Sequence, residues 1–287
     1  MTIQTDVVLR DHCSYRTGGA AEFYAAVQTD GDLAQALEFA AEKKLEITVI
    51  GGGYNVLIND KGVKGLVINT AGLNCHTVIN GTAVYAGAGF VIDELAAETV
   101  SRGLGGMEDM SGIPGCVGGA VKMNAGAFST EIKDIAVYVD MMDFDGRTYR
   151  VSNADAGFGY RKADGLHGIV LGAMFGLKKA DAEELKNKRA EILARREEKQ
   201  PLHLPSCGSV FKRPEGNYAG TLIEKCGLKG YRIGGAQVAE KHANFILNTG
   251  GATADDIYRL IKHVQDTVEK QTGVRLEKEV RFIGFEE

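Results

Sequence analysis

The chain has 287 residues, of which 44% are hydrophobic and 25% charged, a composition typical of a soluble globular protein of two or three domains. It carries 33 Lys and Arg residues against 38 Asp and Glu residues, without a long basic run, so no nucleic-acid partner is expected. The N-terminus lacks the apolar segment of a signal peptide and no run approaches the length of a membrane span, so we expect a cytoplasmic protein that does not bind membranes. The five cysteines are scattered without metal-ligand spacing, so we expect reduced thiols and no metal.

Helical and strand patterns alternate through the first 180 residues. A helix is predicted to begin at Asp30 or Asp32 as its cap and to end at Lys43 and Lys44, because apolar residues between these positions recur on one face. A second helix is predicted over residues 92–103. Strands are predicted at residues 46–53, 65–69, 83–89, 135–144 and 168–177, with a hairpin turn at Asp145 and Gly146 after the fourth strand. This mixture indicates an α+β fold.

A highly charged helix is predicted to precede a C-terminal domain. It covers residues 181–200, where only a narrow stripe containing Leu185 and Ile192 is apolar, and Pro201 ends it. The elements predicted beyond it are a helix from Thr253 to Gly273 and a strand over residues 274–284.

Two glycine-rich loops are candidates for a ligand site. The P-loop motif, the G-x-G-x-x-G motif of Rossmann folds and the G-x-S-x-G nucleophile elbow are all absent from the sequence. The loops at residues 49–57 and 111–127 remain, and bare backbone amides of this kind favour an anion. Two such loops fit a ligand with a pyrophosphate. The alternative is that the glycines only allow close packing of neighbouring elements.

Eight short motifs follow one another over residues 15–284. They are YRTGG (15–19), GGGYNVL (51–57), SGIPGCVGGAVKMNAGA (111–127), FGYR (158–161), GSVFKRP (208–214), AGTLIEKCGLKG (219–230), AEKHANFILN (239–248) and LEKEVRFIG (276–284). In this order they resemble the UDP-N-acetylenolpyruvoylglucosamine reductases, flavoenzymes of peptidoglycan precursor synthesis. The absence of an insertion near residue 180 resembles the shorter, second class of this family, which lacks a tyrosine-bearing lid.

The resemblance implies a fold, a domain organisation and a reaction. The fold is α+β, with a two-part non-Rossmann FAD-binding fold (PCMH-like) over residues 1–70 and 71–196, and a C-terminal α/β substrate-binding domain over residues 197–287. The implied cofactor is FAD, and NADPH is the co-substrate that reduces it. The implied substrate is a UDP-sugar, UDP-N-acetylglucosamine enolpyruvate, whose enolpyruvyl ether is reduced to the lactyl ether of UDP-N-acetylmuramate.

The resemblance also implies which residues hold FAD. The implied positions are Arg16, Gly51, Gly52, Gly53, Tyr54, Asn55, Ser111, Gly112, Pro114, Gly115, Gly118, Gly119, Asn124 and Gly126. On its own, Arg16 is equally well interpreted as a surface arginine. Tyr54 replaces a small hydroxyl residue that is frequent in the family, so its ring is expected to lie over the cofactor instead.

Three residues are implied in catalysis. Arg161 and Glu279 stabilise the charge that develops beside the substrate carboxylate, and Ser209 donates the proton that completes the product. Without the resemblance, the same residues are interpreted as a charge at a strand end, the solvent face of an edge strand and a turn residue.

The resemblance also implies which residues contact the UDP-sugar. They are Tyr160, Lys212, Arg213, His242 and Asn244, where cations and amide donors suit a diphosphate. A purely structural histidine is the alternative for His242. Cys207 lies two residues before Ser209 where the family usually has a small apolar residue, and we expect it to be open to oxidation or alkylation.

Two other classes of function stay open. A small-molecule FAD oxidase of the same fold would pass its electrons to oxygen, but it would not need the C-terminal GSVFKRP and LEKEV motifs. A non-catalytic nucleotide-sugar-binding module would keep the glycine loops but would not need Arg161, Ser209 and Glu279 together. No obligate protein partner is expected in any of these cases.

Overall fold

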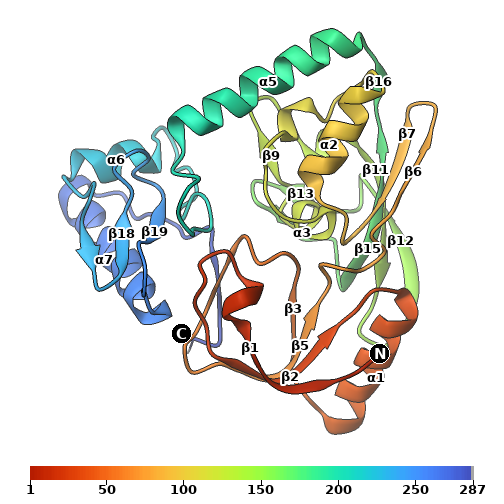
Figure 1. Ribbon diagram of the computed structural model, residues 1–287, viewed down its shortest axis with the longest axis horizontal. Coiled ribbons are helices and arrows are strands. Elements are labelled where there is room, and N and C mark those ends of the chain that lie inside the picture. Colours follow the sequence, from red (N-terminus) through yellow and green to blue (C-terminus); the bar gives the residue numbers. More distant parts are fainter. Residues whose placement is uncertain (286–287) are drawn as a thin grey trace. The chain divides into compact units, whose positions relative to one another are not determined.

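The computed structural model describes residues 1–285, which form two compact units (Figure 1). The first unit comprises Met1–Gln4, Phe23–Gly52 and Gly65–Arg196. The second comprises Thr5–Glu22, Gly53–Lys64 and the chain from Glu197 onward. The division into three domains at residues 70 and 196 stays a prediction.

An N-terminal sheet has the strand order β1-β2-β5-β3. Its elements and the helix beside it are β1 (Gln4–Val8), β2 (Ala20–Ala26), α1 (Asp30–Lys43), β3 (Ile47–Ile50) and β5 (Val63–Asn69). The apolar face of α1 packs in one cluster with Leu66 and Ile68 of β5, so the predicted amphipathic helix is confirmed.

The start of α1 differs from the prediction of Asp30 or Asp32 as cap. Thr29 is the N-cap: its hydroxyl accepts the N–H of Asp32 at 3.1 Å, while the Asp32 carboxylate accepts the N–H of Thr29 at 3.0 Å. The prediction was wrong because Asp32 supplies the returning half of a capping box, whereas Asp30 lies in the first turn.

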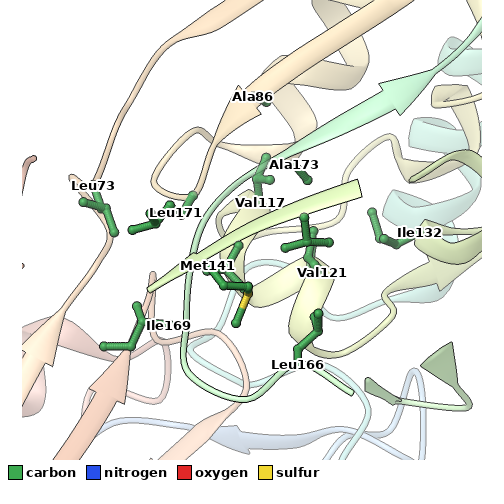
Figure 2. Packing of buried hydrophobic residues seen from close by; sticks show 14 of the residues in the cluster. Leu73, Ala86, Val117, Val121, Ile132, Met141, Leu166, Ile169, Leu171 and Ala173 are labelled. Atoms are coloured by element: carbon green, nitrogen blue, oxygen red, sulfur yellow. The ribbon is translucent and has the colours of Figure 1, made fainter. Parts of the chain in front are cut away.

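A five-stranded antiparallel sheet lies in the first unit, in the order β12-β11-β15-β7-β6. Its strands are β6 (Thr77–Asn80), β7 (Ala83–Gly87), β11 (Ala136–Met142), β12 (Thr148–Ser152) and β15 (Ile169–Gly176). The predicted hairpin between β11 and β12 is confirmed, with Gly146 in the left-handed region at φ 83°. Helix α3 (Val117–Lys122) packs on this sheet, and Figure 2 shows its Val117 and Val121 beside Ala173 and Met141.

Several short elements and the long helix α5, which begins in the first unit, follow. They are α2 (Ile92–Ser101), β8 (Leu104–Gly105), η2 (Glu108–Met110), β9 (Gly126–Ala127), β10 (Thr130–Glu131), α4 (Ile132–Ile135), β13 (Phe158–Gly159), β14 (Lys162–Ala163), β16 (Lys178–Lys179) and α5 (Ala182–Lys199). Of the α5 side chains only Leu185 and Ile192 are buried, which confirms the predicted narrow stripe. None of the helices within residues 1–285 is both long and apolar enough to cross a membrane.

The second unit combines a small antiparallel sheet, β17-β18-β19, with two helices. Its elements are η1 (Leu9–His12), β4 (Val56–Ile58), α6 (Ala219–Lys225), β17 (Arg232–Ile233), β18 (Ala236–Val238), β19 (Ile246–Asn248), α7 (Ala254–Thr272) and β20 (Arg281–Ile283). The predicted strand over residues 274–284 is confirmed only at Arg281–Ile283, which pairs in parallel with β4. It is interrupted because the N–H groups of Glu279 and Val280 both point to the carbonyl of Val210, at 2.7 and 3.4 Å, and this breaks the regular ladder.

The N-terminus of α7 generates a prediction about stability. The Thr253 hydroxyl accepts the N–H of Asp256 at 3.0 Å, and the Asp256 carboxylate accepts the N–H of Thr253 at 3.2 Å. Thr253→Ala removes this cap, so the free energy of unfolding should fall by about 1 kcal/mol in urea titrations. Thr253→Ser keeps the hydroxyl and should restore most of the loss. Equal unfolding midpoints for Thr253→Ala and the parent protein would contradict the prediction.

Candidate active site

The glycine loop of residues 111–127 is tied to the segment that leads from β7 into α2. The N–H of Ile92 donates to the carbonyl of Gly115 at 3.0 Å, and the N–H of Val117 donates to the carbonyl of Phe90 at 2.9 Å. Gly115 has φ 103°, a conformation that side-chain-bearing residues rarely adopt. The loop is therefore a fixed turn that delivers the chain into α3.

Two successive glycines in the first turn of α3 have opposite environments. A Cβ atom at Gly118 would lie 3.1 Å from the Cβ of Ala88, and the Gly118 N–H already donates to the Ala88 carbonyl at 2.8 Å. A Cβ atom at Gly119 would meet nothing within 4 Å, and this residue is exposed. No side chain caps this turn of α3. Gly118 therefore serves packing, and its N–H and that of Val117 are already hydrogen-bonded to backbone carbonyls, whereas Gly119 has open space beside it.

The beginning of the loop is held by α5 rather than left open. The N–H of Gly112 donates to Asp93 at 2.7 Å, and Asp93 forms an ion pair with Arg189 at 2.6 Å. Arg196 donates from Nε to the carbonyl of Ser111 at 2.8 Å. Partial burial acts to raise the pKa of Asp93, but the hydrogen bonds from Arg189 and the Gly112 N–H outweigh it and hold that pKa below its ordinary value.

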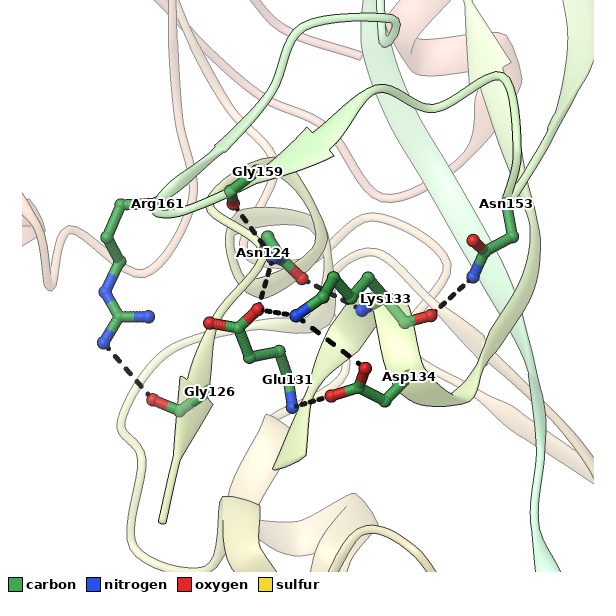
Figure 3. A network of polar contacts seen from close by, with 8 residues as sticks. All are labelled: Asn124, Gly126, Glu131, Lys133, Asp134, Asn153, Gly159 and Arg161. Carbon is green, nitrogen blue, oxygen red and sulfur yellow. Dashed lines mark hydrogen bonds and ion pairs between the residues drawn. The ribbon is translucent and has the colours of Figure 1, made fainter. Parts of the chain in front are cut away.

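Arg161 occupies the tip of a two-residue hairpin between β13 and β14. Its φ of 58° places it in the left-handed region, which is uncommon for a residue with a side chain. Its guanidinium donates from Nη2 to the carbonyl of Gly126 at 3.3 Å (Figure 3). It also lies 5.0 Å from the ring centroid of Tyr160, the other tip residue. Backbone strain of this kind is found preferentially at functional sites.

In the second unit, a narrow strip of backbone pairing holds Ser209 and Glu279. Ser209 forms an isolated bridge with Phe245, and the next residues pair with the chain at Lys278. The N–H of Glu279 donates to the carbonyl of Val210 at 2.7 Å, which brings the backbones of residues 209–210 and 279 together. The Ser209 side chain is half-buried and makes no hydrogen bond within the described part of the chain, so its hydroxyl is available to a ligand.

Two polar side chains support this strip. Asn244 accepts the N–H of Phe211 through Oδ1 at 3.0 Å and donates from Nδ2 to the Phe211 carbonyl at 2.8 Å. Asn55 donates from Nδ2 to the carbonyl of Glu279 at 3.3 Å. Both residues were predicted as ligand contacts, and the structure places their amides on the backbone that carries Ser209 and Glu279.

The remaining predicted contacts of the second unit are distributed as follows. Lys212 forms an ion pair with Glu277, and Arg16 forms one with Asp11 at 3.3 Å. The guanidinium of Arg213 lies 4.1 Å from the centroid of the Tyr218 ring. Tyr54 is 45% exposed, and a Cβ at Gly53 would lie 2.1 Å from the carbonyl oxygen of His12. His242 accepts the N–H of Asn244 on Nδ1 at 3.3 Å. Burial lowers the pKa of His242, so the imidazole is neutral near pH 7 and fits the structural alternative.

The expectation that Cys207 is open to oxidation or alkylation is wrong. Cys207 is 5% exposed, donates from Sγ to the carbonyl of Val56 at 3.1 Å and lies 3.1 Å from the Ser14 hydroxyl. Burial raises the pKa of its thiol to about 12. Because the thiolate is the reactive form, closeness to Ser209 in sequence does not make this thiol reactive.

Comparison with known proteins assigns the chain to a family. A reductase from Agathobacter rectalis is 42% identical over 97% of this chain and 93% of its own length, and one from Lactobacillus delbrueckii is 42% identical over 100% and 97%. Both are named UDP-N-acetylenolpyruvoylglucosamine reductase. This chain belongs to that family. The family's C-terminal domain pattern matches residues 200–283, and an FAD binding domain pattern matches residues 21–152. The crystal structure of the reductase from Thermus caldophilus matches 99% of both chains, with a TM-score of 0.85 and 34% identity.

Membership of the reductase family makes this an α+β protein with a non-Rossmann FAD-binding fold, as the motifs implied. Two glycines of the first unit leave room for that cofactor. Gly119 faces open space, and a Cβ at Gly51 would meet only the Thr70 hydroxyl, at 3.9 Å. Close packing explains Gly53 and Gly118, as the alternative interpretation of the glycine loops expects, and cofactor contacts at the other glycines stay a prediction.

Sequence reasoning missed the residues of α2 and α5 that hold the glycine loop of residues 111–127. Asp93 and Arg189 form a part-buried ion pair although 96 positions separate them, and no motif joins them. Arg196 was seen only as part of a charged helix. The one available signal was that α5 has few apolar residues, so it must attach to the unit through its charges.

The environment of Cys207 generates a prediction about thiol chemistry. Native protein treated with iodoacetamide near pH 8 should be labelled at exposed Cys75 and should remain unlabelled at Cys207, as measured by peptide mass spectrometry. Protein unfolded in guanidinium should be labelled at both, which controls for detection. Labelling of Cys207 at the rate of Cys75 in the native protein would show that the thiol is accessible.

Proposed function

We propose that this protein binds FAD and uses NADPH to reduce UDP-N-acetylglucosamine enolpyruvate to UDP-N-acetylmuramate, in the synthesis of peptidoglycan precursors, through Arg161, Ser209 and Glu279. The observation that carries the activity is near-full-length similarity to the reductases, together with an FAD-binding domain pattern. It is an FAD-dependent oxidoreductase. The residue roles are supported by the environments described above.

The loops of the first unit would hold FAD through residues whose backbone is open. Gly51 and Gly119 leave space for it beside the backbone. The chemistry supplied by bound FAD is transfer of a hydride from NADPH to the enolpyruvyl group. Gly112, Gly118 and Ser111 shape the loop through contacts within the chain.

The chain's own residues would manage the charge and the proton. Arg161 is a fixed cation that forks onto the substrate carboxylate, and it stabilises the negative charge that builds up beside that carboxylate. Glu279, if protonated, donates a hydrogen bond to the enolic oxygen. Ser209 then gives its hydroxyl proton to the adjacent carbon, and its lack of a hydrogen bond within the described residues suits that role.

The remaining contacts concern the UDP-sugar. We assign Lys212 and Arg213 to its phosphates because both are cations close in sequence to Ser209, and Tyr160 to the substrate because it shares the hairpin tip with Arg161. His242 stays a candidate contact in its neutral form. The protein would act in the cytoplasm without an obligate protein partner. The net charge of −5 argues against a nucleic-acid partner.

The activity has a direct test that also separates the alternatives. Purified protein should be yellow, should bleach with NADPH in the absence of oxygen, and should recover its colour on addition of UDP-N-acetylglucosamine enolpyruvate. Colourless protein that binds only the nucleotide sugar would indicate a binding module. Recovery with oxygen but not with the enolpyruvate would indicate an oxidase.

The cofactor assignment predicts a loss of flavin at one glycine. Gly119→Val should leave the fold intact, because nothing lies within 4 Å of the added Cβ, but should fill the space assigned to FAD. Flavin content per chain should fall strongly while the circular dichroism spectrum is unchanged. Gly31→Val is the matched control, since Gly31 lies in the first turn of α1, where a Cβ would meet only Thr29 at 3.7 Å. Full flavin content in Gly119→Val would remove this loop from the cofactor site.

The proton-donor assignment predicts a selective loss at Ser209. Ser209→Ala should retain its flavin and its rate of reduction by NADPH, because no protein acid is needed in that half-reaction. The half-reaction with the enolpyruvate should slow by about 10² to 10⁴, the usual cost of a missing general acid. Ser206→Ala, three residues earlier, should react at the parent rate. A parent-like oxidative rate in Ser209→Ala would show that the proton comes from another donor.

A further inference from the structure

Arg161 is held at both of its ends by the structure around it. Its backbone lies at the tip of the β13–β14 hairpin with φ 58°, and its guanidinium donates to the carbonyl of Gly126 in β9. A left-handed residue with a long side chain persists only where its surroundings determine it. A further group must therefore hold the β13–β14 hairpin and the Gly126 carbonyl in place relative to each other.

Asn124 contacts both of these elements. It is fully buried, and its Nδ2 donates to the carbonyl of Gly159, the residue before the hairpin tip, at 2.9 Å. The same Nδ2 donates to Oε2 of Glu131 at 3.0 Å, while its Oδ1 accepts the N–H of Lys133 at 2.9 Å. All the hydrogen-bonding groups of this side chain are therefore engaged within the first unit (Figure 3).

Glu131 carries the connection to the acceptor of Arg161. In the β9–β10 pair, Glu131 stands directly opposite Gly126. A Cβ at Gly126 would lie 2.6 Å from Cγ of Glu131, so the two residues are in close contact. Lys133 pairs with the Glu131 carboxylate, and this contact offsets its charge. The Asn124 amide thus joins the β13–β14 hairpin, which carries Arg161, to the β9–β10 hairpin, which supplies the Gly126 carbonyl that accepts from Arg161.

The backbone of Asn124 explains why asparagine can stand here. It follows the C-terminus of α3 with φ 40°, its N–H donates to the carbonyl of Val121 at 3.0 Å, and the N–H of Ala125 donates to Ala120 at 2.7 Å. This is a Schellman motif, in which glycine or asparagine is preferred at this position. Glycine would satisfy the cap equally well, so the cap alone does not require the amide side chain.

We propose that Asn124 is a positioning residue for Arg161, acting through the Gly159 carbonyl and Glu131, and not a contact of FAD. This inference rests on the proposed role of Arg161 in the reaction. It gives the loop of residues 111–127 two separate tasks: Gly119 leaves space for the cofactor, and Asn124 aligns the cation.

Asn124→Gly tests the proposal because it removes the amide and keeps the helix cap. Flavin content and the rate of reduction by NADPH should stay at parent values, while the half-reaction with the enolpyruvate should slow about ten- to a hundredfold, as expected for a displaced catalytic group. Hydrogen exchange across residues 158–163 should become faster by severalfold, because the hairpin loses its anchor. Asn74→Gly is the matched control: Asn74 also has a positive φ, of 50°, but its amide donates to Asp30 and to the carbonyl of Leu171, outside this network, and the change should affect neither measurement.

A double-mutant comparison shows whether the effect passes through Arg161. The double variant Arg161→Lys/Asn124→Gly should react about as slowly as Arg161→Lys alone. Once the guanidinium has been replaced, its alignment by Asn124 no longer affects the rate. Multiplied losses, or a loss of flavin in Asn124→Gly, would overturn the proposal. If Arg161→Lys leaves the oxidative half-reaction unchanged, the role of Arg161 itself is wrong, and hydrogen exchange still decides whether Asn124 anchors the hairpin. If Asn124→Gly is not recovered folded, Asn124→Ser, which keeps one donor, should show the same pattern to a smaller degree.

Discussion

The close approach of α3 to the chain after β7 determines the arrangement of the first unit's loop. The N–H of Gly118 bonds to the carbonyl of Ala88, and a Cβ at Gly118 would lie 3.1 Å from the Cβ of Ala88, closer than an ordinary contact. This contact sets the rotation of α3 about its axis. With Gly118 directed inward, Gly119 is exposed, and the far end of the helix delivers Asn124 into the interior. One glycine contact therefore controls both ends of a six-residue helix.

Around Arg161, the free-energy cost of a left-handed backbone is similar in size to the free energy gained from hydrogen bonds. A left-handed residue with a Cβ costs roughly 1–2 kcal/mol. Each net hydrogen bond contributes about 0.5–1.5 kcal/mol. The two hydrogen bonds made by the Asn124 side chain to Gly159 and Lys133 are enough to offset one such residue, so the hairpin tip can be strained without loss of the local fold. An unpaired amide buried at the same place would have the opposite effect.

Charge plays a different part on the surface of the same unit. Helix α5 has few apolar residues to bury, so it is attached by Arg189 to Asp93 and by Arg196 to the Ser111 carbonyl. The pair of Arg189 and Asp93 is partly shielded from water, with side chains 17% and 34% exposed, and this makes it more effective than a fully exposed pair. Because Asp93 also accepts the Gly112 N–H, the attachment of α5 and the shape of the loop depend on the same carboxylate.

The sequence by itself determined the family, the reaction and most of the long elements, because ordered motifs and apolar periodicity are local properties of the chain. It placed α1 and α7 through their apolar stripes, and α5 through its charged composition and the proline that follows it. Only the tertiary structure decided the roles of individual residues. Cys207 is buried against Val56 and Ser14, which are far away in sequence, and Asn124 meets Gly159 across 35 positions of the chain. Motifs specify which residues are present, whereas burial and hydrogen-bond partners depend on segments that the sequence does not place together.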